Sequence, residues 1–293
     1  MKILIFGGSG PIGYYLFKEL RANKHLVDAT YFTNNMFSEI EHKLDTTNSE
    51  STKNLITRIN PDLVIDTVAL SGVDLAETNH KMADSVTVEG TKNIINGCKI
   101  TKSKIVYIST TYVFGDNEKI HTEADTPQPA NYYGVTKLRA EELVINSGLD
   151  YLILRTDQPY GWIRGNQRKN SVIRTLDTLK TGNVLKEITD WYSVPTYLPD
   201  FALATCKLVE NNESGIFHVT GNGYLSRYEW ALQIADVFGL NKKLIVPIES
   251  SELKLPAKRS NPNVSNKKLI QRTNIMMKGI TEGLLDMIKN PQI

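Results

Sequence analysis

Short apolar runs of strand length alternate with longer amphipathic segments along the first half of the chain. The apolar runs predict strands at residues 2–6, 26–31, 63–67, 104–108 and 151–154. The amphipathic segments predict helices at residues 11–21, 51–59, 81–99 and 132–146. This alternation is typical of parallel βαβ units, and several runs are apolar on both faces, as a sheet between two helical layers requires. The pattern therefore predicts an α/β fold with a doubly wound parallel sheet.

The regular alternation of apolar runs and amphipathic segments ends after Arg155, where prolines and glycines divide the chain into loops. A helix is then predicted at 199–209, a strand at 215–220 and an amphipathic helix at 227–238. Because the strand follows a helix that can serve as a crossover, we expect it to join the main sheet as a further strand.

These patterns divide the chain into two interleaved units. We expect a doubly wound α/β domain over residues 1–158, completed by segments around 196–220. Residues 159–293 are expected to form a smaller C-terminal lobe that binds the substrate.

The charge of the chain is nearly balanced, because it contains 34 lysines and arginines and 32 acidic residues, which gives a net charge of +2. Such a balance creates no field that would attract nucleic acid or an anionic membrane, so a small molecule is the expected partner. No apolar run approaches the ~18 residues of a membrane-spanning helix, and the first run is too short for a signal peptide. We therefore expect a cytoplasmic protein.

The two cysteines, Cys98 and Cys206, are far apart in the sequence and belong to no CxxC or Cys/His motif. This spacing predicts neither a disulfide framework nor a zinc site. The histidines are scattered as well, so we expect no metal.

A glycine-rich loop connects the first predicted strand to the first predicted helix. Gly7, Gly10 and Gly13 lie in the sequence GGSGPIG. Glycines at this place allow a tight turn, a close approach of backbone to a pyrophosphate, and close packing of helix on strand. Pro11 suits the first helical turn, where an N–H group has no helical partner. The loop predicts a dinucleotide phosphate site, with a plain tight turn as the alternative. We therefore expect residues 1–158 to form a Rossmann-type NAD(P)-binding domain.

The residues about 20 positions beyond the last glycine of such a loop usually bind the cofactor ribose. Thr33 and Asn34 lie there, in a segment without the acidic residue that would bind a ribose hydroxyl. The segment also lacks an arginine for a 2′-phosphate, and Lys43 is the nearest later lysine. We expect NADPH as the cofactor, with NADH as the alternative.

Tyr133 and Lys137 lie four residues apart at the start of a predicted helix, so both project from one face. A phenol with its ordinary pKa of about 10 is a poor acid at neutral pH, and a neighbouring ammonium group lowers that pKa. The pair therefore predicts that Tyr133 protonates a carbonyl oxygen during reduction. The same spacing also occurs by chance on solvated helices.

The predicted strand 104–108 strengthens this interpretation, because it ends at Ser109-Thr110-Thr111-Tyr112. Doubly wound proteins bind their ligands at the carboxyl ends of the strands. Thr110 is expected to donate a hydrogen bond to the substrate carbonyl oxygen beside Tyr133. Capping of the strand end is the alternative role for Ser109 and Thr111.

Together these motifs resemble the extended short-chain dehydrogenase/reductases, and within them the dTDP-4-dehydrorhamnose reductase branch. Further matching stretches are VDLAE at 73–77, STTYVFG at 109–115, LRT at 154–156, SVPT at 193–196, GIFH at 215–218 and KRSNPNVS at 258–265. The resemblance covers most of the chain and implies that Thr110, Tyr133 and Lys137 are catalytic. It implies cofactor contacts along the glycine loop, in an adenine-side turn and at a strand end: Gly7, Gly10, Pro11, Ile12, Gly13, Asp45, Thr46, Val68, Ala69 and Leu70.

Two positions depart from the family pattern. The aspartate that usually follows the catalytic threonine is Thr111 here, and an asparagine usual in the helix segment 85–88 is Thr87. The first departure leaves the identity of the sugar open. The second should affect only the packing behind the nicotinamide.

Four residues are expected to line the substrate site: Thr111, Tyr112, Trp162 and Arg259. Trp162 would stack on the substrate, and Arg259 would pair with a phosphate. In the alternative interpretation Trp162 packs within the lobe and Arg259 is a surface charge.

The resemblance implies an NADPH-dependent reductase that acts on the 4-keto group of a nucleotide-activated deoxysugar. A sugar-nucleotide epimerase that recycles bound NAD is one alternative. A non-catalytic NADP-binding subunit, like the family's regulatory partner of methionine adenosyltransferase, is the other. Dehydration is disfavoured, because Thr111 and Tyr112 replace the acid pair that it uses. The expected partner is a sugar nucleotide, and the chain could also form a homodimer.

Overall fold

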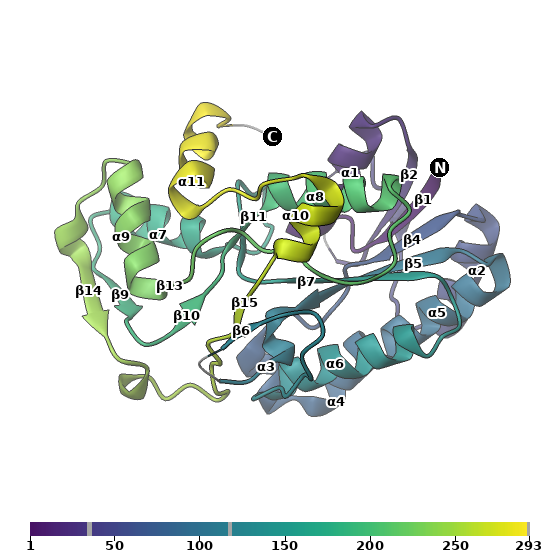
Figure 1. The fold of residues 1–293 in the computed structure, drawn as a ribbon, viewed down its shortest axis with the longest axis horizontal. Coiled ribbons are helices and arrows are strands. Elements are labelled where there is room, and N and C mark those ends of the chain that lie inside the picture. The colour runs from purple at the N-terminus through teal and green to yellow at the C-terminus, as the bar shows by residue number, and fades with distance from the viewer. Residues whose placement is uncertain (34–36, 117–118, 292–293) are drawn as a thin grey trace.

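A seven-stranded parallel sheet forms the centre of the computed structural model, which describes residues 1–33, 37–116 and 119–291 (Figure 1). Its strands are β1 (Lys2–Phe6), β2 (Leu26–Tyr31), β3 (His42–Lys43), β4 (Leu63–Asp66), β5 (Lys104–Thr110), β7 (Tyr151–Thr156) and β12 (Gly215–His218). They lie in the order β12-β7-β5-β4-β1-β2-β3, and each neighbouring pair is parallel. The chain winds outward in both directions from β1 and β4, which confirms the predicted doubly wound α/β fold.

Helices cover both faces of this sheet (Figure 1). One face carries α1 (Pro11–Ala22), α8 (Leu198–Glu210) and α10 (Lys267–Thr273), and the other carries α2 (Ser49–Ile59), α5 (Gly90–Thr101) and α6 (Tyr132–Ile145). Ile3 and Ile5 of β1 belong to the first core layer, whereas Leu4 and Phe6 belong to the second. The strand is apolar on both faces because both faces are buried.

Two elements differ from the expectations. The helix expected at 81–99 is divided into α4 (His80–Ala83), the π-helical segment η1 (Asp84–Glu89) and α5, and it follows the short α3 (Val73–Thr78). A π-turn adds residues to a helix without interrupting the apolar pattern, so periodicity does not reveal it. Strand β3 has only two residues, too few for an alternating pattern.

The remaining elements form the second lobe and its connections. Its helices are α7 (Ser171–Lys180), α9 (Arg227–Val237) and α11 (Ile280–Lys289). Its short strands pair as β6 (Ile120–His121) with β15 (Asn263–Val264), β8 (Pro159–Tyr160) with β11 (Thr196–Tyr197), β9 (Leu185–Ile188) with β14 (Ile245–Ile248), and β10 (Tyr192–Ser193) with β13 (Leu225–Ser226). Single 3-10 turns are η2 (Thr111–Val113), η3 (Lys242–Leu244) and η4 (Ser250–Glu252). Tyr160, Trp230 and Leu284 lie in a separate apolar core of this lobe.

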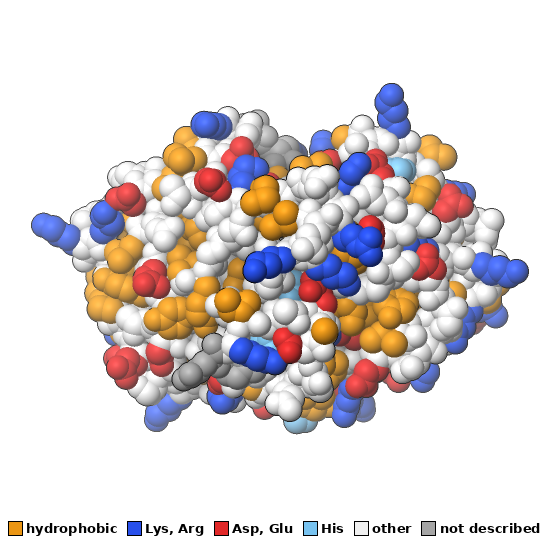
Figure 2. All heavy atoms as spheres, viewed as in Figure 1, with side chains coloured by type: hydrophobic (Ala, Val, Ile, Leu, Met, Phe, Trp, Pro, Cys, Tyr) orange, Lys and Arg blue, Asp and Glu red, His pale blue; other side chains and the backbone are white. Residues whose placement is uncertain are grey.

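The surface carries charged side chains of both signs. Figure 2 shows lysine and arginine side chains interspersed with acidic ones across one face. Within the described ranges, no helix has the length and apolar character needed to cross a bilayer.

A buried ion pair joins α6 to the sheet. Arg155 of β7 donates to both carboxylate oxygens of Glu141, from Nε at 2.9 Å and from Nη2 at 2.6 Å. The hydroxyl of Ser109 on β5 donates to the same carboxylate at 2.5 Å. Both members of the pair are about 2% exposed or less. The pair therefore connects α6 to the two strands whose carboxyl ends carry Thr110 and Thr156.

We predict that Glu141→Ala lowers the free energy of unfolding by about 3–5 kcal/mol, because the substitution leaves the Arg155 charge buried without a counter-charge. Urea unfolding followed by circular dichroism measures this change. Glu142→Ala is the matched control at the exposed neighbouring position and should change stability by less than about 0.5 kcal/mol. Equal effects of the two substitutions would contradict a structural role for the pair.

Candidate active site

The glycine loop lies between β1 and α1 and has the shape of a phosphate cradle. Gly7 adopts φ +80°, and its N–H donates to Thr30 Oγ1 at 3.1 Å. A Cβ atom on Gly13 would lie 2.3 Å from the carbonyl oxygen of Gly7, so the helix approaches the turn too closely for any side chain. Helix α1 begins at Pro11 and has no side-chain cap at Gly10. Its first N–H groups are therefore available to an anion, as a pyrophosphate requires.

The other predicted cofactor residues lie around the carboxyl ends of β1, β2 and β4, with Ile12 in the first turn of α1. Thr33 is exposed just beyond β2, whereas Asn34 lies outside the described residues. Asp45 accepts hydrogen bonds from the N–H and hydroxyl of Thr47 at 2.9 and 2.8 Å. The carbonyl of the buried Thr46 accepts from Asn93 Nδ2 at 2.9 Å. Asn93 thus holds the adenine-side turn against α5.

Val68, Ala69 and Leu70 follow β4 directly and are half-buried. The N–H of Leu70 donates to the hydroxyl of Thr87 in η1 at 3.1 Å. Thr87 is fully buried and so connects the π-helical segment to this strand end. Thr87, which stands where the family usually has asparagine, therefore still provides a side chain that forms a hydrogen bond.

The predicted catalytic residues lie where β5 ends and α6 begins. Thr110 is the last residue of β5, and Tyr133 and Lys137 are in the first two turns of α6. A Cβ atom on Gly134 would lie 2.2 Å from the carbonyl oxygen of Tyr112, so this glycine lets the helix start directly against the strand end. The rings of Tyr112 and Tyr133 meet edge to face, with centroids 6.2 Å apart.

Lys137 is buried beneath this strand end. Its Nζ donates to the carbonyl oxygen of Ile108 at 2.6 Å and lies 4.1 Å from the centroid of the Tyr107 ring. Burial lowers the pKa of Lys137 to about 8, although the charges of Asp66 and Glu141 oppose that shift. Lys137 therefore remains mainly charged at neutral pH.

Tyr133 is held in its phenol form at neutral pH. Burial raises its pKa, whereas the Thr110 hydroxyl and the charge of Arg168 act in the opposite direction. The predicted lowering of this pKa by the Lys137 ammonium group is therefore not found, because burial of the phenol outweighs the opposing effects. A protonated phenol beside a threonine hydroxyl can donate to an oxygen that gains negative charge. This arrangement can supply a proton to a carbonyl oxygen.

A buried carboxyl group lies close to Lys137. The sequence patterns did not identify it. Asp66, the last residue of β4, accepts from Val68 N–H at 2.9 Å and from the Thr91 hydroxyl at 2.8 Å. Burial raises its pKa, and the Lys137 charge acts in the opposite direction. An acid at the end of an otherwise apolar strand is a signal that could have identified it.

Asp157 is a second carboxyl group that the predictions missed. Thr110 pairs with Thr156 across β5 and β7, so Thr111 and Asp157 follow on neighbouring strands. Asp157 is 2% exposed and accepts from Val194 N–H at 2.8 Å. Burial raises its pKa to about 6, although hydrogen bonds and the charge of Arg227 partly oppose the shift. A carboxyl group is therefore present near the strand end although position 111 is threonine.

Several polar groups between the two lobes lack partners. Among the described residues, buried atoms without a hydrogen-bond partner include Tyr112 Oη, Trp191 Nε1, Ser193 Oγ, Arg227 Nε, Arg259 Nε and Ser260 Oγ. The Cζ atoms of Arg227 and Arg259 lie 5.3 and 5.2 Å from the Trp191 ring. An unpaired buried polar group costs about 1–3 kcal/mol. This region is therefore suited to a polar ligand.

The four predicted substrate residues have different environments. Thr111 and Tyr112 are buried in η2, next to Thr110. Arg259 donates to Asp74 Oδ2 at 2.6 Å and to the Ala257 carbonyl at 2.9 Å, so two of its donors are already engaged.

The Trp162 side chain is half-buried and has partners within the second lobe. Its indole N–H donates to the Met287 carbonyl at 2.8 Å, and its ring packs edge to face on Phe238. These contacts place it in the apolar packing of the second lobe, as the alternative interpretation had it. Trp191 is the tryptophan that lies near Tyr112 and the two arginines.

A loop of the second lobe reaches both the glycine loop and the end of β4. Gln167 donates from Nε2 to the Ser9 carbonyl at 2.9 Å, and Arg168 donates from Nη1 to the Ser71 carbonyl. Neither residue belongs to a motif that the sequence patterns revealed. The loop connects the two lobes across the proposed cofactor site.

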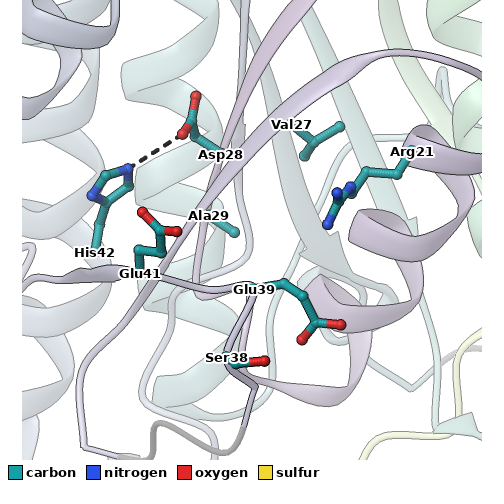
Figure 3. Close-up of a pocket in the computed structure, with 8 residues that line it drawn as sticks. All are labelled: Arg21, Val27, Asp28, Ala29, Ser38, Glu39, Glu41 and His42. Carbon is teal, nitrogen blue, oxygen red and sulfur yellow. Dashed lines mark hydrogen bonds and ion pairs between the residues drawn. The ribbon is translucent and has the colours of Figure 1, made fainter.

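A cavity of about 420 Å³ lies beside β2 and β3 at the edge of the sheet (Figure 3). It is lined by Arg21, Val27, Asp28, Ala29, Ser38, Glu39, Glu41 and His42. The carboxylates of Asp28, Glu39 and Glu41 would repel a phosphate, so we assign this cavity no cofactor role.

The parallel sheet, the glycine loop and the Tyr133–Lys137 pair at a strand end define an extended short-chain dehydrogenase/reductase. The family model described as RmlD substrate binding domain matches residues 1–293, and the chain belongs to that family. This is the family of dTDP-4-dehydrorhamnose reductase-like proteins indicated by the sequence motifs.

Two solved structures have closely similar folds. The dTDP-4-dehydrorhamnose reductase of Clostridium acetobutylicum is 30% identical, with a TM-score of 0.88 and 100% of both chains covered. The dTDP-4-dehydrorhamnose reductase of Bacillus anthracis, solved in complex with NADP, is 26% identical with the same TM-score and coverage. A curated relative with another name is methionine adenosyltransferase 2 subunit beta of Rattus norvegicus. It is 29% identical over 257 residues, which are 85% of this chain and 76% of the relative.

We predict that Gly13→Ala weakens NADPH binding at least about 100-fold, or roughly 2.7 kcal/mol, because the new methyl group would meet the Gly7 carbonyl oxygen. Titration of NADPH fluorescence measures the affinity. Gly10→Ala is the matched comparison, since its Cβ atom would lie 3.3 Å from the same oxygen, and it should bind more tightly than Gly13→Ala. Wild-type affinity in a folded Gly13→Ala variant would exclude the loop as the phosphate site.

Proposed function

We propose that this protein is an NADPH-dependent reductase of the 4-keto group of a nucleotide-activated deoxysugar. The observation that carries the proposal is the placement of Thr110, Tyr133 and Lys137 at the end of β5, on the same side of the sheet as the glycine loop after β1, with only β4 between the two strands. When bound, NADPH supplies a hydride to the carbonyl carbon. Tyr133 gives its phenolic proton to the carbonyl oxygen, and Thr110 orients that oxygen by a hydrogen bond. Lys137 stabilises the phenolate that remains.

The surroundings of the site support a sugar nucleotide as substrate. The unpaired polar atoms near Trp191 and Arg259 could bind hydroxyl and phosphate groups. The relatives named dTDP-4-dehydrorhamnose reductase suggest dTDP-4-dehydrorhamnose as the first compound to test. NADPH is favoured over NADH, because the B. anthracis relative was solved with NADP and because no acidic residue occupies positions 31–35.

A non-catalytic NADP-binding subunit is the second candidate. The 29% identity to a methionine adenosyltransferase subunit favours it. The complete Thr110–Tyr133–Lys137 set is the argument for an enzyme, since binding alone does not require a proton donor at this place.

We predict that Tyr133→Phe reduces turnover of dTDP-4-dehydrorhamnose about 10²–10⁴-fold while NADPH still binds, because only the proton donor is removed. Loss of NADPH absorbance measures turnover, and fluorescence titration measures binding. Tyr132→Phe is the matched control, since the Tyr132 hydroxyl donates to Asp84 at 2.8 Å and should not reach the substrate. Nearly full activity of Tyr133→Phe would refute the assignment. No turnover by the wild type, despite NADPH binding, would favour the binding-subunit candidate.

We also predict that the rate of reduction falls as the pH rises above about 8. Lys137 has its pKa lowered to about 8 by burial, so the ammonium group is present below this pH and is lost above it. Without the positive charge the phenolate formed on proton transfer is less stable, and Tyr133 becomes a weaker acid. The pH profile of kcat/KM tests this expectation. A profile that stays flat up to pH 10, or one that Lys137→Met leaves unchanged, would contradict it.

A further inference from the structure

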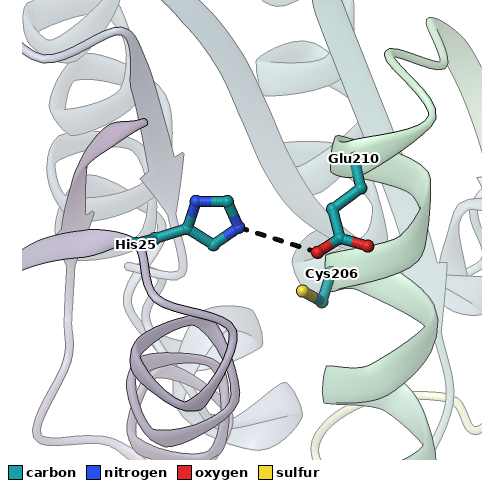
Figure 4. A group of neighbouring side chains, drawn as sticks. All are labelled: His25, Cys206 and Glu210. Carbon is teal, nitrogen blue, oxygen red and sulfur yellow. Dashed lines mark ion pairs between the residues drawn. The ribbon is translucent and has the colours of Figure 1, made fainter.

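Three potential metal ligands meet at the amino ends of the strands, opposite to the carboxyl ends that carry the proposed active site. His25 directly precedes β2, and Cys206 and Glu210 lie one turn apart on α8 (Figure 4). The imidazole nitrogen, the sulfur atom and a carboxylate oxygen all lie within 4.8 Å of one another. The sequence shows no metal-ligand spacing here, because folding alone brings His25 next to α8.

The group is buried on one side and accessible on the other. Cys206 is 2% exposed and forms no disulfide, and the His25 and Glu210 side chains are 11% and 37% exposed. His25 Nε2 is buried without a hydrogen-bond partner and lies 3.9 Å from Glu210 Oε1. An ion could therefore enter past Glu210 and meet a nitrogen that has no other polar contact.

The charges around Cys206 favour a cation. A carboxylate oxygen of Glu210 lies within 4.8 Å of the Cys206 sulfur, so a negative charge already faces the position of the thiol. Two amino groups border the site: Lys207 Nζ lies 4.0 Å from Glu210 at the exposed side, and the Met1 nitrogen lies 3.4 Å from His25 Nδ1. A divalent ion between the sulfur and the carboxylate would reduce the repulsion between them and accept the thiolate as a ligand.

We propose that His25, Cys206 and Glu210 form a binding site for a divalent transition-metal ion, with zinc as the best match. Imidazole nitrogen, thiolate and carboxylate oxygen are the ligand types that zinc takes in proteins, usually with four ligands arranged as a tetrahedron. Three protein ligands leave the fourth position to water. Positions i and i+4 of a helix project side by side, so α8 presents two ligands together.

Metal binding at this site must release protons. The Cys206 thiol loses its proton to become a ligand, and the imidazole must offer an unprotonated Nε2 with its proton on Nδ1. The affinity should therefore increase with pH.

The proposed ion would connect parts of the fold that already pack together. Helices α1 and α8 lie side by side in one core layer, and His25 lies in the turn from α1 to β2. An ion that binds the folded chain but not the unfolded chain would raise the free energy of unfolding. The site is independent of NADPH, substrate and the proposed reductase activity.

Cobalt(II) titration of the full chain, kept reduced with a phosphine, provides the test. Cobalt replaces zinc in such sites, and its bond to a thiolate gives a charge-transfer band in the near ultraviolet. We expect one equivalent to produce the band in the wild type and zinc to abolish it by displacement. Cys206→Ser should lose the band, whereas Cys98→Ser should keep it, since Cys98 is also a buried free thiol.

His25→Gln is a second variant that keeps the thiol and changes a partly exposed side chain. It should fold and bind cobalt at least roughly tenfold more weakly. Absence of the band in the wild type, or a band that survives in Cys206→Ser, would overturn the proposal. Unchanged affinity in His25→Gln would do the same. None of these measurements uses NADPH or substrate, so failure of the metal site and failure of the reductase proposal can be distinguished.

Discussion

The bond from the buried Lys137 ammonium group to the Ile108 carbonyl oxygen is the contact on which the proposed chemistry depends. It holds α6 against the carboxyl end of β5 and so keeps Tyr133 beside Thr110. Burial disfavours the charged form of Lys137 and lowers its pKa, whereas the charges of Asp66 and Glu141 act in the opposite direction. The same low-polarity surroundings that lower the pKa of Lys137 raise that of Tyr133, so both groups are protonated at neutral pH.

The second lobe contributes to this site through contacts with the first. Gln167 and Arg168 reach the Ser9 and Ser71 carbonyls, and Arg259 binds Asp74. Near these contacts several buried donors have no partner within the described residues. Folding thus leaves polar groups unsatisfied where a sugar nucleotide would lie, and its binding would recover part of that cost.

Local patterns in the sequence were sufficient for six of the seven strands of the main sheet and for the glycine loop, because apolar runs and glycine spacing act over a few residues. The two-residue strand β3 is too short to show such a pattern. Asp66 was missed although its place at the end of an apolar strand is a local signal, whereas the surroundings of Asp157 depend on which strands are neighbours. Trp162 was assigned to the substrate, but its orientation depends on packing against α11, which no local pattern encodes. His25 and Cys206 likewise meet only after α8 packs beside α1.

Transfer of deuterium from labelled NADPH tests the central claim most directly. NADPH carrying deuterium at the transferred position is incubated with dTDP-4-dehydrorhamnose, and the product is analysed by mass spectrometry and NMR. Reduction as proposed places one deuterium on C4 of the sugar for each NADPH consumed. An isomerised sugar without deuterium, or an unchanged sugar beside bound NADPH, would contradict the reductase account.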